Sequence, residues 1–180
     1  MMVLKMQTMA ALSYLMAIKI KQDLKNADVR GLISDLIGIN INSVLEWGKQ
    51  QDVSAMPSFV TVQLNPSARL GVYKKFNKQT EIQRNESQRE TTAIISFHGN
   101  NAVTMAQYAQ ECLYTEQAKY LFDRIKAGLV NVSDVQNLTI PFGGGYEERA
   151  QFQMILSHDF IIEHEQNRIE SVDIGLVLNQ

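Results

Sequence analysis

Three histidines are the first residues to test for chemistry, because imidazole can bind a metal or carry a proton near neutral pH. They are His98, His158 and His164. Two ligands on one strand favour a spacing of two residues, whereas His158 and His164 are six residues apart, which is about 20 Å along a straight strand. The spacing therefore predicts no shared metal site, with His158 facing the core and His164 solvated in a turn.

Nucleophilic and phosphate chemistry have little support in the sequence. Cys112 is the single cysteine, so no intrachain disulfide can form, and no histidine lies near it in sequence. We interpret it as a small buried residue on a helix. The glycines at 143–145 lack the Lys-Ser/Thr of a phosphate-binding loop, and a strand pattern follows them instead of a helix. The Gly-x-Ser-x-Gly signature of a hydrolase nucleophile is absent.

Acidic pairs are the remaining candidates for acid–base work. Glu147 and Glu148 are adjacent, so on a strand their side chains would point to opposite faces and could not converge. Glu163 and Glu165 fit solvated charges near a turn. We therefore predict no catalytic residue, no cofactor site, no metal site and no enzymatic activity.

The charge is distributed unevenly along the chain. Residues 1–89 hold twelve Lys and Arg against seven Asp and Glu, a charge of +5, and residues 90–180 hold five against twelve, a charge of −7. Solvated faces arranged by chance could give this asymmetry. The alternative is a molecule with two oppositely charged surfaces, suited to head-to-tail packing in a ring.

Length and composition predict one globular domain. The chain has 180 residues, 45% of them hydrophobic and 20% charged, with three prolines and no linker-like tract. The order of the expected elements is strand, strand, helix, helix and then three strands. It predicts an α+β fold, a two-layer sandwich of a mostly antiparallel mixed sheet with helices packed on one face.

Helical periodicity occurs in three segments of the body, at 28–38, 102–113 and 116–126. We expect Asp28 to cap the first helix and Gly38 to end it. Asn100 or Asn101 should cap the second, whose alanine stripe would allow close packing on a sheet. Gly128 should stop the third helix.

Alternating apolar residues predict the strands. The expected strands are 43–47, 58–64, 91–97, 138–141, 149–162 and 169–178, the last two forming a hairpin that closes the sheet. Asn65, Pro66 and Ser67 are typical turn residues and predict a turn after 58–64.

The amino terminus is strongly apolar. We interpret residues 2–25 as an amphipathic helix that buries its Met and Leu side chains against a neighbour, within an extension of residues 1–27 that precedes a domain of residues 28–180. A targeting segment and a membrane anchor at 2–20 are the alternatives. The uncharged apolar stretch is too short to span a bilayer, which needs about 20 residues.

Residues 69–89 are polar, basic and interleaved with Tyr73 and Phe76. An exposed strand pair at about 66–90 and a long loop both fit this pattern. A basic segment with aromatics can grip nucleic acid, but Glu81 and Glu86 dilute its charge, so we favour an arm that contacts another subunit. The predicted interface residues are Arg69, Lys74, Lys75, Lys78, Arg84, Arg89, Glu90, Glu147, Glu148 and Arg149.

Several blocks of the chain are similar to a known family. A Met56-Pro57 connection enters an alternating strand, Arg89-Glu90 opens a strand that ends at Phe97-His98-Gly99-Asn100, and an Ala-spaced helix follows. Tyr146-Glu147-Glu148-Arg149-Ala150 opens a later strand, and residues 169–174 form the last block. Over residues 29–180 the sequence resembles the neck or tail terminator proteins of tailed bacteriophages.

This resemblance implies a structural virion protein of the tail or neck, assembled in the host cytoplasm. It implies a homo-hexameric ring that caps the tail tube and joins it to the head-side connector or stopper proteins. DNA would pass through the lumen without specific binding, past acidic or neutral residues, and no membrane would be involved. The alternative is a non-enzymatic head-completion adaptor, or another partner-binding module that uses the basic segment 70–88.

Overall fold

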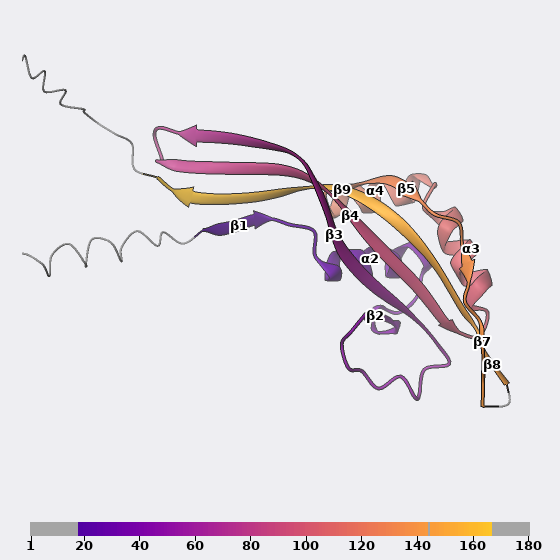
Figure 1. The fold of residues 1–180 in the computed structure, drawn as a ribbon. Coiled ribbons are helices and arrows are strands. Elements are labelled where there is room, and N and C mark those ends of the chain that lie inside the picture. Colours follow the sequence, from indigo (N-terminus) through magenta and orange to yellow (C-terminus); the bar gives the residue numbers. More distant parts are fainter. Residues whose placement is uncertain (1–17, 144, 167–180) are drawn as a thin grey trace, which may run out of the picture.

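The protein is an α+β sandwich in which one curved sheet carries helices on a single face (Figure 1). The computed structural model describes residues 18–143 and 145–166. This architecture confirms the predicted fold class.

Three long antiparallel strands form the centre of the sheet. They are β3 (Ser58–Asn77), β4 (Ile82–Gly99) and β9 (Arg149–Glu165), with β4 in the middle. Short strands flank them, namely β2 (Val44–Glu46) parallel to β3 and, along the free side of β9, β6 (Gln136–Asn137), β5 (Ala127–Val132) and β1 (Lys19–Gln22). A separate hairpin is formed by β7 (Ile140–Phe142) and β8 (Gly145–Glu147). It lies at the end of the molecule where β9 begins (Figure 1).

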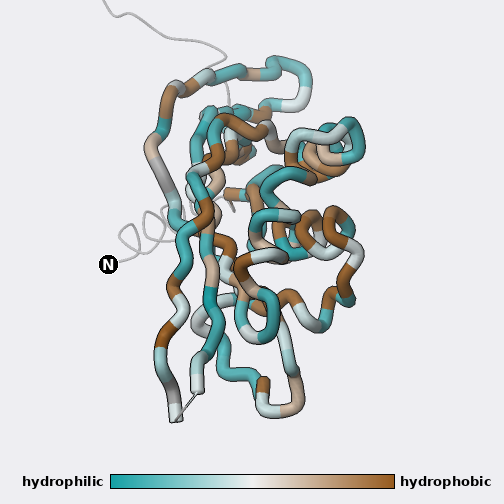
Figure 2. The backbone as a smooth tube through the Cα atoms, turned by 90° about the vertical axis from the view of Figure 1, so that its right-hand side faces the viewer, coloured by the Kyte–Doolittle hydropathy of each residue, from teal (hydrophilic) through white to brown (hydrophobic). Residues whose placement is uncertain are grey.

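The helical layer buries the apolar side of the sheet. It consists of α2 (Asn26–Ile37), α3 (Ala102–Cys112) and α4 (Glu116–Arg124), with a short 3₁₀ turn η1 (Ile41–Ser43). Alternate sheet residues such as Ile95, Phe152 and Met154 are fully buried in one core with the helices. Each such side chain contributes about 1.5–3 kcal/mol through removal from water. Figure 2 shows hydrophobic and hydrophilic segments interleaved along the strands.

The alanine stripe of α3 packs on the sheet as predicted. Ala102, Ala106 and Ala109 are buried, and the helix contacts β4 and β9. Asn101 occupies the N-cap position as predicted, but it has φ 61° and its side chain makes no capping hydrogen bond. Instead, the carboxylate of Glu148 accepts a hydrogen bond from the Ala102 N–H at 3.1 Å. A negative charge at this position also suits the helix dipole.

The first predicted helix is confirmed, with one correction at its start. Asp28 is not the cap but lies in the first turn, where its carboxylate accepts a hydrogen bond from the Lys25 N–H at 3.0 Å. Gly38 follows the last turn with φ 69°, in the left-handed region that favours glycine, and its N–H bonds to the Ser34 carbonyl.

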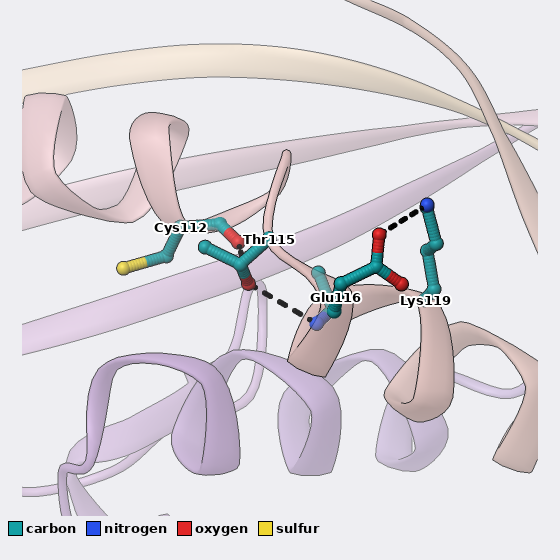
Figure 3. Close-up of polar contacts among 5 residues, drawn as sticks. Cys112, Thr115, Glu116 and Lys119 are labelled. Atoms are coloured by element: carbon teal, nitrogen blue, oxygen red, sulfur yellow. Dashed lines mark hydrogen bonds and ion pairs between the residues drawn. The ribbon is translucent and has the colours of Figure 1, made fainter.

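The junction between α3 and α4 is fixed by Thr115. Its hydroxyl donates to the Cys112 carbonyl at 2.7 Å and accepts from the Ala118 N–H at 3.2 Å, so it caps α4 (Figure 3). Glu116 and Lys119 form an ion pair at 2.6 Å one turn further on.

Part of the predicted amino-terminal helix is instead a strand. Lys19–Gln22 forms β1, which pairs antiparallel with residues 161–163 of β9. Charged and apolar residues alternate here, and the edge of β9 offers backbone groups that a helix would leave unpaired. This part of the predicted 1–27 extension therefore belongs to the sheet, and residues 1–17 lie outside the described residues.

The predicted turn at residues 65–67 is wrong, because β3 continues through it to Asn77. The pairing with β4 shifts between Pro66 and Arg69 and again between Arg69 and Gly71. Proline cannot donate to the ladder and is tolerated in a strand at such irregular positions. The sequence signal thus marked a bulge rather than a reversal of the chain.

One other prediction needs revision near β9. Residues 127–132, where Gly128 was expected only to end a helix, form β5. The predicted last strand at 169–178 lies outside the described residues.

Candidate subunit-interaction surface

The distal parts of β3, β4 and β9 form a sheet extension that runs beyond the helical layer (Figure 1). We call residues 69–77, 82–89 and 158–165 the arm. The register pairs Asn77 with Ile82, Arg69 with Arg89 and Ile82 with Glu165. The predicted strand pair at 66–90 is therefore present, and β9 adds a third strand that sequence reasoning did not place there.

The pairing register divides the arm into two faces, because paired residues in a ladder point to the same side and neighbours alternate. The inner face continues the side of the sheet that packs on the helices. It carries the cations Arg69, Lys74 and Arg89, and none of the carboxylates of the described arm residues. Phe76, Val72 and Ile162 share this face.

The outer face collects the acids. Its carboxylates are Glu86, Asp159, Glu163 and Glu165, and Lys75 and Arg84 share the face; Glu90 at the base of the arm and Lys19 of β1 point to the same side. Two of the acids are neutralised locally, by the Arg84–Glu86 pair at 3.3 Å and the Lys21–Glu163 pair at 3.4 Å. Among the described residues, Glu90, Asp159 and Glu165 have no ion-pair partner.

Arg69 and Arg89 lie directly opposite each other on β3 and β4. Arg89 places its guanidinium 3.9 Å from the centre of the Phe160 ring, a cation–π contact. Its buried Nε has no hydrogen-bond partner in the described part of the chain, while Arg69 is exposed. Like charges opposite each other in a ladder destabilise the pair, so this site favours an added anion.

A shallow groove of about 180 Å³ surrounds the two arginines. Its inner-face lining includes Val72, Lys74, Phe160 and Ile162. Glu86 also borders it, but its carboxylate is paired with Arg84. The groove thus combines cations with apolar side chains, the composition of a protein contact.

Large apolar side chains on the arm are poorly covered. Val72 is 50% exposed and Phe76 37% on the inner face, and Tyr73 on the outer face is 62% exposed. Ile20 of β1, paired with Ile162, is 63% exposed. Exposed apolar groups that lie together beside charges are typical of interaction surfaces.

The outer edge of β3 is the second open feature. Only Val60, Thr61 and Val62 pair with β2, and the Trp47 N–H bonds to the Val62 carbonyl. Beyond them, residues 63–77 have no strand on this side within the described ranges. By contrast, β6, β5 and β1 cover the free side of β9 in turn.

Three of the predicted interface residues lie at the opposite end of the sheet and make contacts inside the protomer. Arg149 binds Glu147 at 3.0 Å, and Glu148 caps α3. The other predicted residues lie on or beside the arm, with Lys78 in its turn and Glu90 at its base. The structure therefore brings together the β3 and β4 candidates and leaves the 147–149 cluster apart.

Two histidines occupy structural positions, whereas His164, predicted to be solvated in a turn, is partly buried in β9 opposite Gln83. His158 is buried and its Nε2 lies 2.9 Å from the Thr91 hydroxyl, which confirms that it faces the core. His98 stacks on Phe59 at 4.5 Å and contacts the Thr61 hydroxyl at 3.1 Å. Burial, followed by the nearby positive charge of Arg149, lowers the pKa of His98. No group of three metal-binding side chains occurs in residues 18–143 and 145–166.

Cys112 is half-buried against the core rather than fully buried. Its thiol lies beside Tyr108, and their hydrogen bond raises the pKa of the tyrosine. A groove of about 710 Å³ lies between β1, the start of α2 and the end of α4. Its charged lining consists of Lys21, Asp23, Lys25, Asp28, Arg124 and Lys126.

Within the described ranges, none of the helices has the length and apolar character needed to cross a membrane. The fold is that of an α+β protein, and the arm is a sheet extension with exposed apolar and charged side chains.

The model of the phage neck terminator protein family matches residues 27–180. The chain belongs to this family, which confirms the resemblance seen in the sequence. Its role is structural, in the tail and neck of the phage particle. No curated protein matches the chain.

Proposed function

We propose that this protein is a tail or neck terminator that forms a homo-oligomeric ring of six subunits. The ring caps the tail tube and presents a docking surface to the connector or stopper proteins on the head side. Assembly takes place in the host cytoplasm, and the protein catalyses no reaction.

The arm is the observation that carries this proposal. Its strands are fully paired with one another, yet they extend beyond the helices with exposed apolar side chains. A lone surface of this kind is an aggregation hazard unless another protein covers it. Membership in the neck terminator family also supports the proposal, because a neck protein must contact other proteins of the particle.

Opposite charges on the two arm faces suit a ring built from head-to-tail contacts. In such a ring each subunit uses one surface to contact the next and a different surface to contact the previous one. Neutralisation of the inner-face cations at these contacts would leave few free cations to hold DNA phosphates in the lumen. This suits passage of DNA without specific binding.

Mass measurement by light scattering, with purified protein alone and with purified tail tubes, tests the proposal. We expect a discrete assembly of six subunits, free in solution or seated at one tube end, and electron micrographs should show a ring. A monomer at high concentration that also leaves tube ends bare would contradict it.

A further inference from the structure

We propose that the Arg69–Arg89 pair on the inner face of one arm binds a carboxylate from the outer face of a second copy's arm. The inference rests on the proposed function and names the contact that builds the oligomer. The carboxylates are those of Glu90 and Asp159.

The arginine pair has no carboxylate partner among the described residues of its own protomer. Arg69 and Arg89 are cross-strand partners of like charge, and the described inner face supplies no carboxylate between them. Two guanidinium groups side by side bind a carboxylate through charge-assisted hydrogen bonds of about twice the strength of neutral ones. An anion supplied by another molecule would remove the repulsion and give donors to both side chains.

The surroundings of the pair favour a protein carboxylate over a phosphate. Phe160 lies beneath the Arg89 guanidinium, and Val72 and Ile162 line the same groove. These apolar groups would be buried by a protein surface but would stay in water under a hydrated DNA backbone. Val72 is half exposed in the single copy, which leaves apolar area to bury.

The outer face of a second arm provides the complementary surface. Asp159 is paired across the ladder with Gln88, and Glu90 with Ser157, so the two carboxylates are close neighbours on adjacent strands. Among the described residues neither has an ion-pair partner, whereas Glu86 and Glu163 do. The Asp159 and Glu90 carboxylates are therefore free to bind outside their own protomer.

The geometry also explains how one contact could build a closed assembly. The donor face and the acceptor face lie on opposite sides of the same three strands, so each copy can use both at once. Contacts of this heterologous kind propagate until the rotation between copies closes a ring.

Charge reversal on one face at a time is the test. Arg69→Glu is chosen because Arg69 is exposed, so the fold should tolerate it, and Asp159→Arg reverses the other face. Each variant alone should lower the assembled fraction at least tenfold, measured by light scattering with tail tubes present. Lys126→Glu, the same charge change at an exposed residue just after α4 and away from the arm, should assemble like the wild type.

Mixing the two variants gives the decisive measurement. An Arg69→Glu copy carries an acid at both contact positions, 69 and 159, and an Asp159→Arg copy carries an arginine at both, so contacts between like copies should be weakened. An equimolar mixture should restore assembly, with the two variants alternating, because each contact again joins opposite charges. Circular dichroism and thermal unfolding of each variant establish that both are folded.

Four results would overturn the inference. Wild-type assembly that survives Arg69→Glu would leave the proposed function intact and refute this contact. Loss of assembly by both variants without rescue on mixing would mean that the two faces do not meet. Tight binding of a short DNA duplex that Arg69→Glu abolishes, without effect on assembly, would assign the arginines to nucleic acid. A wild-type protein that never assembles, even with tubes, would contradict the proposed function as well.

Discussion

The two halves of the central sheet use the same three strands in different ways. In the proximal half, inner-face positions of β4 hold Ala93, Ile95 and Phe97, all buried under the helices. In the arm, the same face of the same strand holds Arg89, Ser87 and Asn85. The backbone ladder continues without a break between β4 and β9, so the difference lies in the side chains and in what covers them.

The comparison separates two sources of order. Proximal residues are held by a helical layer and an apolar core, which stabilise the isolated chain. Arm residues are held mainly by the ladder, whose hydrogen bonds each contribute only about 0.5–1.5 kcal/mol net, and by a few side-chain contacts such as Arg89 on Phe160. Changes in the proximal half should therefore affect folding, whereas changes in the arm should affect assembly.

Truncation of the core should have the largest effect on stability. Phe152→Ala removes a fully buried ring that lies 6.0 Å from the ring of Phe97. We expect the free energy of unfolding to fall by about 3–5 kcal/mol in urea denaturation. Tyr73→Ala in the arm should change it by less than about 0.5 kcal/mol. Equal losses would mean that the arm is part of the core.

Two glycines offer a matched pair for the same comparison. Gly99 has φ 88°, and a Cβ there would lie 2.1 Å from the Pro57 carbonyl oxygen. Gly99→Ala should thus cost about 2 kcal/mol or more, by thermal or urea unfolding. A Cβ at Gly71, at the base of the arm, would meet nothing within 4 Å. Gly71→Ala should leave stability close to the wild type, and a large loss there would contradict the open packing of the arm.

The helix cap supplied by Glu148 should have an intermediate effect. Glu148→Ala removes the acceptor for the Ala102 N–H, and the loss of a helix cap costs about 1 kcal/mol. Glu90→Ala, an acid on the arm side of the sheet, is the control and should alter unfolding little. If Glu148→Ala changed assembly but not stability, the assignment of Glu148 to a contact inside the protomer would be wrong.

His98 should give the smallest effect, visible as a pH dependence. Because burial lowers its pKa in the folded protein, protonation favours the unfolded state. The free energy of unfolding should fall as the pH decreases through and below 6.5, the ordinary value for histidine. His98→Gln should make this decline shallower in denaturation curves between about pH 7 and 5. An unchanged slope would show that the pKa of His98 is the same in the folded and the unfolded state.

Much of the fold could be predicted from periodicity, and the failures share a cause. The helices at 28–38 and 102–113 and the strand from Arg149 were visible because their apolar residues recur at a regular period. The turn predicted at Pro66 failed because local turn residues cannot reveal that β4 pairs with β3 on both sides of a bulge. The helix predicted at Lys19–Gln22 failed because the edge of β9, far away in sequence, determines that segment.

The candidate surface was predicted in composition but not in arrangement. Basic residues at 69–89 indicated an arm, yet their separation onto two faces depends on the register with β4. The acids of β9 belong to the arm because β9 pairs with β4, with Asp159 opposite Gln88, and this pairing cannot be seen in the sequence. Arg149 and Glu147 looked like interface residues because they are charged at a strand start, but the structure pairs them with each other.

Backbone hydrogen exchange of the protein, free and assembled on tail tubes, tests the central claim most directly. We predict that amides of residues 69–77 on the open side of β3 gain protection on assembly, while core amides around Ile95 and Phe152 keep the protection they already have. Unchanged exchange in the arm, with new protection confined to another surface, would contradict an arm built for contact between copies.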